Sequence, residues 1–304
     1  MNYLITTLCP KKCPYCFFPS QQKGTISDMT LETFIECFEH QAKIGRLSWN
    51  LKRRVALLGG EPTVAKHFKD IVGFIHANMF RVDLFMLFSN LAGFENIKWL
   101  VKHNFESIDV SIIWNSTGFS SYAANLKKAT YKSLDLLKQH KVKIVASITL
   151  EPHQEAKHFE YLLNVKREYG ISHIRFALDT GQLPEFRTKG TMVFQVLKLL
   201  CDAGFFIAVD GCGSPCLNIF NREQTRFLSN LDGVNIFCDG SAGIDILPDG
   251  TCIPCMPYLN FKGERPKFTD LTSLADLQKI YGFTPRTKML CPAKENISRL
   301  NMLI

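Results

Sequence analysis

The sequence predicts an α/β fold in which helices cover a parallel sheet. Between residues 3 and 178, short apolar segments alternate six times with longer segments whose apolar residues recur at helical spacing. The short segments are too apolar to leave one face in water, which is typical of strands in a parallel sheet. The length of 304 residues accommodates one large α/β domain and a smaller appendage.

The elements follow one another as strand, then helix. The expected strands span residues 3–8, 55–58, 82–88, 107–113, 142–150 and 174–178. The expected helices span residues 30–44, 68–79, 97–102, 123–139 and 155–169. In the first helix, Leu31, Phe34 and Phe38 share one face, and Gly170 is placed to cap the last helix.

The pattern changes after residue 185. A helix is expected at 192–203, and the alternation around Asp249-Gly250 predicts a tight β-hairpin. Six of the eleven cysteines lie beyond residue 210, at positions 212, 216, 238, 252, 255 and 291. We therefore expect two domains, at 1–185 and 186–304.

Composition narrows the class of protein. No apolar stretch has the length of a membrane span, and Lys11 and Lys12 interrupt any signal-peptide core, so we expect a cytoplasmic protein. Eleven cysteines in such a chain favour metal or redox chemistry over disulfides. The net charge of +8 is scattered, and iron–sulfur clusters would reduce it, so it does not favour a nucleic-acid partner.

The most informative motif is a group of three cysteines near the N-terminus. Cys9, Cys13 and Cys16 lie within eight residues, and the aromatic Tyr15 precedes the third. Three thiolates can hold a [4Fe–4S] cube, whose fourth iron then stays open to a small chelating molecule. A zinc knuckle or a chance cluster of cysteines is the alternative interpretation.

A second motif follows the second expected strand, where residues 55–63 read Val-Ala-Leu-Leu-Gly-Gly-Glu-Pro-Thr. Gly59 and Gly60 lack side chains where the strand ends, so backbone can approach a ligand closely. Glu61 is then expected at the mouth of the sheet, where it could accept hydrogen bonds from an ammonium group. Taken alone, Gly-Gly-Glu-Pro could be an ordinary turn at the end of a strand.

Together and in this order, the two motifs resemble the radical S-adenosylmethionine (radical SAM) superfamily. The resemblance implies a partial (β/α)6 TIM-type barrel with its ligand residues at the carboxyl ends of the strands. It implies a [4Fe–4S] cluster on Cys9, Cys13 and Cys16 whose open iron binds SAM, and reductive cleavage of SAM to a 5′-deoxyadenosyl radical.

The resemblance also implies a set of SAM contacts. The segment Gly59, Gly60, Glu61 and Pro62 would hold the methionine amino group. The further expected contacts are Tyr15, Ser89, Asn90 and Ser111. Ser89, Asn90 and Ser111 could instead be ordinary polar residues of a turn or strand. No residue is assigned to the SAM carboxylate.

The later cysteines resemble the opening of a SPASM or twitch domain, a C-terminal extension that carries auxiliary [4Fe–4S] clusters. The dense cysteine run of a second auxiliary cluster is missing, so one auxiliary cluster is expected. Its ligands are expected to be Cys238, Cys255 and Cys291, with Cys216 or Cys212 as the fourth. Free thiols or a zinc site are the alternative.

The remaining cysteines are not expected to bind iron. Side chains alternate faces along the strand that follows Gly250, so Cys252 and Cys255 should point to opposite sides, and Cys255 is favoured as the ligand. Cys37 and Cys201 are expected to be buried, inert thiols within helices.

The function predicted from this resemblance is hydrogen abstraction from a substrate, with oxidation or cross-linking of a peptide side chain favoured. Dehydrogenation or rearrangement of a small metabolite such as a sugar alcohol or nucleotide is the main alternative, and RNA modification or a non-enzymatic scaffold are further ones. The electron would come from a donor such as flavodoxin or ferredoxin.

Overall fold

The computed structural model describes residues 1–11, 13, 16, 27–45, 54–103, 109–116, 124–150, 159–178, 195–209, 234–236, 244–254 and 263–281. The chain forms two compact units. Unit 1 comprises Met1–Ile113, Ala123–Lys143 and Gly243–Met289. Unit 2 comprises Trp114–Tyr122, Ile144–Ala242 and Leu290–Ile304.

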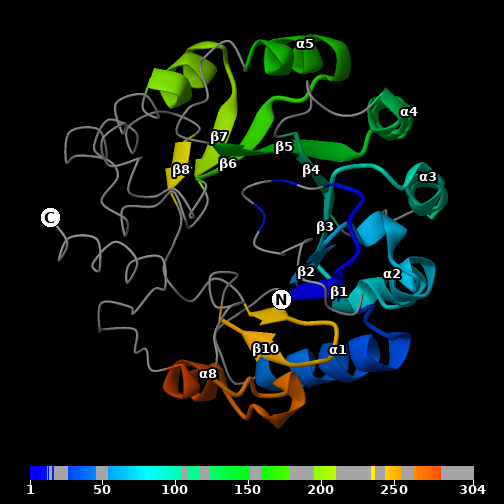
Figure 1. Cartoon of the computed structure of the whole chain (residues 1–304), viewed down its shortest axis with the longest axis vertical. Coiled ribbons are helices and arrows are strands. Elements are labelled where there is room, and N and C mark those ends of the chain that lie inside the picture. The colour runs from blue at the N-terminus through cyan, green and yellow to red at the C-terminus, as the bar shows by residue number, and fades with distance from the viewer. Residues whose placement is uncertain are drawn as a thin grey trace, which may run out of the picture. The chain divides into compact units, whose positions relative to one another are not determined.

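Unit 1 is built on a sheet whose central strands are parallel (Figure 1). Its strand order is β10-β9-β1-β2-β3-β4. The bounds are β1 Asn2–Thr6, β2 Arg54–Gly59, β3 Leu84–Ser89, β4 Asp109–Asn115, β9 Asp245–Ile246 and β10 Cys252–Ile253. Strands β1, β2 and β3 pair in parallel, so their carboxyl ends meet at one edge of the sheet.

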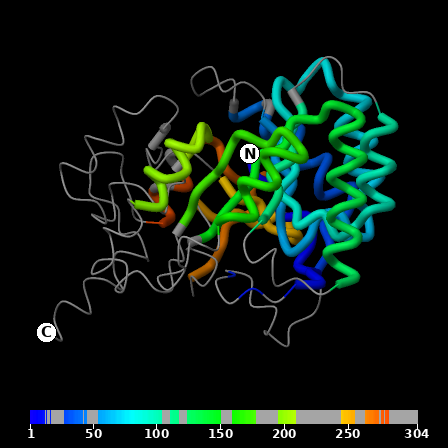
Figure 2. The backbone as a smooth tube through the Cα atoms, turned by 90° about the horizontal axis from the view of Figure 1, so that it is seen from above, coloured from blue at the N-terminus to red at the C-terminus, as the bar shows by residue number. Residues whose placement is uncertain are grey.

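A helix follows each of the first four strands. These helices are α1 (Leu31–Gly45), α2 (Phe68–Ala77), α3 (Phe94–Lys102) and α4 (Ala124–Gln139). Consecutive helices contact one another. Figure 1 shows them in chain order along one side of the strands, and Figure 2 shows the same part of the chain, coloured blue to green, from above. Short 3-10 helices, η1 (Pro62–Val64) and η2 (Met79–Arg81), flank α2.

The core of unit 1 is apolar and largely aromatic where α1 and α2 meet β1. The ring of Phe34 lies 4.7 Å from that of Tyr3 and 6.0 Å from that of Phe74, measured between centroids. Tyr3, Phe34 and Phe38 are buried in this cluster, and Phe74 is partly exposed. The fourth, Phe38, packs edge-on against Phe74 at 5.4 Å.

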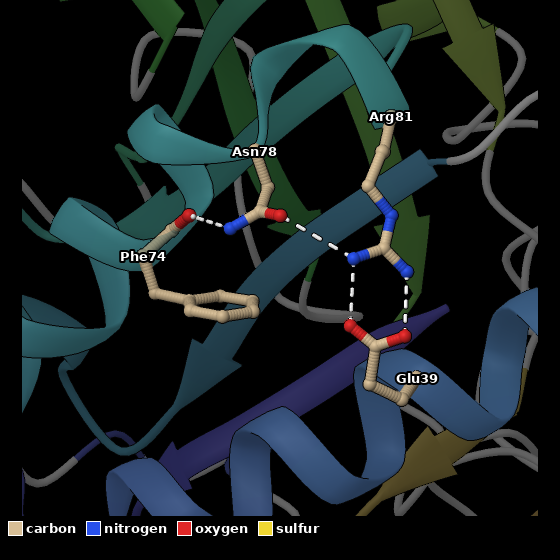
Figure 3. A network of polar contacts seen from close by, with 4 residues as sticks. All are labelled: Glu39, Phe74, Asn78 and Arg81. Carbon is tan, nitrogen blue, oxygen red and sulfur yellow. Dashed lines mark hydrogen bonds and ion pairs between the residues drawn. The ribbon is translucent and has the colours of Figure 1, made fainter.

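A polar contact joins these helices from outside the core (Figure 3). Arg81 of η2 donates to both carboxylate oxygens of Glu39 on α1, at 2.6 and 2.7 Å. Arg81 also donates to Asn78, whose side-chain nitrogen donates to the carbonyl of Phe74. The Glu39 side chain is 46% exposed, so this pair contributes only about 0–1 kcal/mol.

The C-terminal part of unit 1 returns to the N-terminal strand. Strand β9 pairs in parallel with β1 and in antiparallel with β10, which forms the expected hairpin around Gly250. The following 3-10 helix η9 (Phe268–Asp270) contacts α1, and α8 (Leu274–Ile280) comes after it. The hydroxyl of Tyr281 then donates to the carbonyl of Cys252 at 2.8 Å.

Unit 2 contains four parallel strands in the order β5-β6-β7-β8. The bounds are β5 Lys143–Leu150, β6 His173–Leu178, β7 Phe206–Val209 and β8 Val234–Ile236. Helix α5 (Glu160–Tyr169) precedes β6, and residues 195–202 are helical. Gly170 ends α5 in the left-handed conformation with φ 70°, as its C-cap role requires.

The predicted α/β fold with a parallel sheet covered by helices is confirmed. All six predicted strands are present, and β7 and β8 are two further strands that the sequence analysis did not predict. The expected domain boundary at 185/186 and the start of the helix expected at 155–169 fall outside the described residues. None of the helices in the described ranges has the length and apolar composition of a membrane span.

Candidate functional site

The predicted site residues come together at the carboxyl ends of β1, β2 and β3 in unit 1. Cys9 lies three residues beyond β1, the Gly59–Pro62 segment ends β2, and Ser89 ends β3. Strand ends at this edge of a parallel α/β sheet are where such folds place their chemistry. Ser111 is buried within β4 rather than at its end.

Gly59 and Gly60 allow a close approach, but it is to the chain's own backbone. A Cβ on Gly59, whose φ is 140°, would lie 2.3 Å from the carbonyl oxygen of Thr6. A Cβ on Gly60 would lie 2.2 Å from the carbonyl oxygen of Leu8. The two glycines therefore seat the segment that leads directly into Cys9, which refines the expectation that they make room for a ligand.

Two backbone hydrogen bonds hold this approach in place. Gly60 N donates to the carbonyl of Thr6, and Glu61 N donates to the carbonyl of Leu8, both at 2.8 Å. The β1–β2 pairing thus continues beyond the ends of both strands. As a result, backbone hydrogen bonds join the segment that leads into Cys9 directly to the Gly-Gly-Glu-Pro segment.

The loop that carries the cysteines is also closed at its base. Thr7 N donates to the carbonyl of Ser27 at 2.9 Å, and Ser27 N donates to the Thr7 hydroxyl at 3.0 Å. Met29 N donates to the carbonyl of Ile5 at 2.9 Å. The chain therefore leaves β1 at Thr7 and returns to the same place at Ser27.

Glu61 joins the end of β2 to the end of β3. Its carboxylate is buried, with 1% of the residue exposed. Oε1 accepts hydrogen bonds from Thr63 N (3.1 Å), Thr63 Oγ1 (2.5 Å) and Ser89 Oγ (2.6 Å), and Oε2 accepts from Asn90 N (2.6 Å). Burial raises the pKa of Glu61, and these hydrogen bonds act in the opposite direction. Four donors suit the ionised carboxylate, which can only accept.

Asn90 connects this group to the first cysteine. Its side-chain Nδ2 donates to Cys9 Sγ at 3.7 Å, and its Oδ1 accepts from Ala92 N at 3.0 Å. We call Cys9, Glu61, Thr63, Ser89 and Asn90 the strand-end network. Three of its members come from different strand ends, so the network fixes β1, β2 and β3 relative to one another.

The cysteine thiols fit an iron–sulfur cluster by their chemistry. Cys9, which is half-buried, has its pKa raised to about 11 by burial and by the charges of Glu61, Cys13 and Cys16. Metal binding requires the thiolate, and cations or hydrogen-bond donors near sulfur favour that form. Two donors already point at Cys9 Sγ, because Lys11 N lies 3.4 Å from it in addition to Asn90.

Lys11 supplies positive charge beside these thiols. Burial lowers its pKa to about 8, and Cys13 and Cys9 act to raise it, the former also through a side-chain hydrogen bond. Within the described part of the chain, no three His, Cys, Asp or Glu side chains converge on a single-ion site. A cube differs from such a site because each thiolate binds a separate iron atom.

The direct SAM contacts predicted for Glu61, Ser89, Asn90 and Ser111 stay predictions. In the structure, the polar groups of Glu61, Ser89 and Asn90 bind one another and Cys9. Sequence reasoning missed the contributions of Thr63 and of the Thr6–Leu8 backbone. The position of Thr63 directly after Gly-Gly-Glu-Pro was the available signal, since a residue two positions after a capping carboxylate can bond to it.

Several predicted site residues lie outside the described residues. They are Tyr15, Cys212, Cys216, Cys238, Cys255 and Cys291. Of the cysteines not expected to bind iron, Cys37 and Cys252 are buried, with 1% and 0% exposed. The expectation that Cys201 is buried is wrong, because it is only half-buried near the end of its helix.

Solved structures with a similar fold include proteins that have S-adenosylmethionine bound. Streptococcus suis SuiB bound to S-adenosylmethionine matches with a TM-score of 0.63 and 13% sequence identity. The match covers 89% of this chain and 64% of SuiB, so the chain spans less than two thirds of that protein's length. At this identity the likeness concerns the fold.

A second similar structure is anSMEcpe with bound AdoMet, with a TM-score of 0.58, 16% identity and coverage of 92% of this chain and 80% of that one. The same protein with AdoMet and the Kp18Cys peptide matches with a TM-score of 0.56 and 16% identity, over 91% of this chain and 80% of that one. No curated protein sequence matches.

The family comparison agrees with the site. A family model described as the Radical SAM superfamily matches residues 3–164, which is just over half of the 304 residues. The matched region begins in β1 and contains the cysteine loop and the whole strand-end network. This chain therefore belongs to the radical SAM superfamily.

Proposed function

We propose that the chain is an enzyme that holds a [4Fe–4S] cluster on Cys9, Cys13 and Cys16 and uses it with SAM for radical chemistry on a substrate. Membership of the superfamily implies the cluster and SAM. When bound, they supply a 5′-deoxyadenosyl radical, which abstracts a hydrogen atom from the substrate. The residues of this chain position the cluster and SAM, donate hydrogen bonds to them and exclude water.

One observation carries the proposal: backbone hydrogen bonds join the segment that leads into Cys9 to the Gly-Gly-Glu-Pro segment. Glu61 N donates to the carbonyl of Leu8, one residue before Cys9, and the glycines leave no space between the two backbones. A cluster held after β1 and a ligand held after β2 would therefore keep a fixed separation. Such fixed placement is the main contribution a protein makes to cofactor chemistry.

The experiment is anaerobic reconstitution of the full chain with iron and sulfide. We expect about four iron atoms per chain for each cube, and SAM-dependent formation of 5′-deoxyadenosine after reduction. The variant Cys13→Ala removes one of the three thiolates and should abolish both the cube and SAM cleavage. A colourless protein that binds zinc and leaves SAM intact would overturn the proposal.

For the substrate, we propose a peptide whose side chain is oxidised or cross-linked. The support is that a solved structure of anSMEcpe, which shares the fold, has the Kp18Cys peptide bound. The test is incubation of the reduced, reconstituted enzyme with short peptides encoded beside its gene. A mass change in a peptide together with 5′-deoxyadenosine supports the proposal. If a metabolite pool increases 5′-deoxyadenosine formation and no peptide does, the small-molecule alternative is favoured.

We also propose one auxiliary [4Fe–4S] cluster of the twitch type in the C-terminal part, held by Cys238, Cys255 and Cys291 with Cys216 or Cys212. The support is the cysteine spacing in the sequence. If it is present, the Cys13→Ala variant should retain about four iron atoms after reconstitution, while the wild type holds about eight. A wild-type count of about four iron atoms would mean that the chain holds a single cluster.

A further inference from the structure

The side-chain amide of Asn90 has an orientation that its neighbours fix. Oδ1 accepts from Ala92 N at 3.0 Å, which is a turn closed by an Asn side chain onto the backbone two residues on. Rotation of the amide by 180° would place Nδ2 against Ala92 N, so that two N–H donors would face each other. Nδ2 must therefore be the atom that faces Cys9 Sγ, at 3.7 Å.

The backbone of Asn90 is held as firmly as its side chain. Its N–H donates to Glu61 Oε2 at 2.6 Å, and its carbonyl accepts from the Thr130 hydroxyl of α4 at 3.2 Å. The residue is buried, with 4% exposed. Every polar group of Asn90 thus has a partner, and three different elements provide them.

The residue after Asn90 is strained in a way that supports the same placement. Leu91 has φ 62°, in the left-handed region that costs a non-glycine residue about 1–2 kcal/mol. Leu91 N donates to Ser89 Oγ at 2.8 Å, and its carbonyl accepts from the Ser133 hydroxyl at 3.2 Å. These bonds stabilise a turn that the chain would otherwise avoid, and the turn is what directs Asn90 toward the cysteine loop.

We propose that Asn90 is a positioning residue that donates a hydrogen bond to the Cys9 thiolate and thereby raises the reduction potential of the cluster. This inference rests on the cluster binding proposed above. The physical reason is charge: the reduced cluster carries one more negative charge than the oxidised cluster, so a fixed donor at a ligand sulfur stabilises the reduced form more. The electron comes from an external low-potential donor, and no bond or proton changes at Asn90.

The test compares three variants of the full chain after anaerobic reconstitution. Asn90→Ser keeps a short side-chain acceptor for Ala92 N but cannot reach Cys9. Asn90→Asp keeps the acceptor for Ala92 N and turns a carboxylate oxygen toward the sulfur. Asn78→Ser is the matched control, because Asn78 also donates through Nδ2 but lies before the start of β3, at the opposite end of the strand from Asn90.

The readouts are iron and sulfide content and the midpoint potential from a dithionite titration followed by electron paramagnetic resonance. For Asn90→Ser we expect unchanged iron and a reduction equilibrium constant roughly threefold to tenfold lower, a negative shift of ~28 to ~59 mV. Asn90→Asp should shift further in the same direction. Asn78→Ser should match the wild type.

The outcomes separate this inference from the proposed function. Absence of a cluster from the wild type overturns both. A wild-type cluster whose potential is unchanged in Asn90→Ser and Asn90→Asp overturns the role of Asn90 and leaves the proposed function standing. Loss of the cluster from both variants also overturns it, because the hydrogen bond would then serve assembly rather than the potential.

Discussion

Two regions of unit 1 each bring a cysteine against a segment that is distant in sequence, and they do so by opposite means. In the strand-end network, hydroxyls, amides and a carboxylate join Cys9 to β2 and β3. In the second region, ring and side-chain packing joins the hairpin and the segment after it to α1: the Phe268 ring lies edge-on against that of His40 at 5.3 Å, and a Cβ on Gly250 would lie 3.3 Å from the Thr33 methyl group. We call Cys37, Cys252, Phe268 and Tyr281 the hairpin base, since all four are buried there.

The direction of the hydrogen bond at sulfur separates the two regions. Cys9 Sγ receives hydrogen bonds from Lys11 N and Asn90 Nδ2, whereas Cys252 Sγ donates one to the carbonyl of Pro266 at 3.6 Å. Burial raises the pKa of Cys9 to about 11 and that of Cys252 to about 12, so the pKa alone does not distinguish them. A sulfur that accepts is prepared for the thiolate form, and a sulfur that donates is a thiol.

The largest effect should come from exchanging sulfur for oxygen in each region. Cys9→Ser should remove about four iron atoms per chain and abolish SAM cleavage, because a cube needs its thiolates. Cys252→Ser should keep the wild-type iron content and lower the free energy of unfolding by about 1–2 kcal/mol. Iron assays and urea unfolding measure the two effects. Equal iron loss in both variants would remove the distinction between the regions.

The next effect should come from a methyl group added at a glycine in each region. In Gly60→Ala the new Cβ would lie 2.2 Å from a backbone oxygen that cannot move aside, so we expect a loss of about 3–5 kcal/mol. In Gly250→Ala the Cβ would lie 3.3 Å from a Thr33 methyl, and the φ of 81° costs about 1–2 kcal/mol.

Gly73→Ala is the control for these two variants. Gly73 lies within α2, where a Cβ would be 3.9 Å from the Trp99 ring, so alanine should be neutral or stabilise by about 0.5–1 kcal/mol. Urea midpoints of the reduced apoproteins give the order of stability of the three variants. A Gly60→Ala variant as stable as Gly250→Ala would show that the two backbones are not in contact.

How far the sequence predicts each region follows from the range of the interactions. Periodicity predicted the strands that meet at the site, and the Asp249-Gly250 pattern predicted the hairpin, because both signals are local. The pairing of β9 with β1 could not be predicted, since it joins residues more than 240 positions apart and leaves no local pattern. Strands β7 and β8 have only four and three residues, too few for periodicity to reveal.

At the site, the sequence predicted which segments matter but not how their groups bond. Gly59 and Gly60 were assigned to a close approach of backbone to a ligand, which stays a prediction, and the structure shows that the Thr6–Leu8 backbone also lies close against them. Glu61 was expected at the mouth of the sheet as an acceptor for an ammonium group. In the structure it lies at the end of β2 with its carboxylate buried, and it accepts hydrogen bonds from Ser89 and Asn90 at the end of β3. Donor and acceptor pairing across strand ends depends on register, which no single-chain pattern specifies.

A smaller effect should follow from deleting one hydroxyl in each region. Ser89→Ala removes a donor to the buried Glu61 carboxylate and the acceptor of Leu91 N, so we expect a loss of about 2–3 kcal/mol. Tyr281→Phe removes one neutral hydrogen bond to the carbonyl of Cys252, which contributes about 1 kcal/mol. Thermal or urea unfolding of both apoproteins tests the order, and a larger loss for Tyr281→Phe would contradict it.

The effect that is smallest at neutral pH is a pH dependence that belongs to the hairpin base. The unfolded Cys252 thiol loses its proton near pH 9, whereas burial keeps the folded thiol protonated up to a pKa of about 12. Between these values the folded state binds more protons, so this group makes the free energy of unfolding fall as pH rises, by at most about 1.4 kcal/mol per pH unit. Cys252→Ser should therefore flatten the alkaline limb of the stability curve between pH 9 and 11.

Cys201→Ser is the matched control for that pH series. Burial raises the pKa of Cys201 in the same direction, but the residue is only half-buried, so its replacement should flatten the curve less. Urea midpoints collected at intervals across this pH range would resolve the two slopes. If both serine variants follow the wild-type curve, the Cys252 thiol ionises in the folded state as it does in the unfolded chain. The hairpin base would then be open to water and would lose its contrast with the strand-end network.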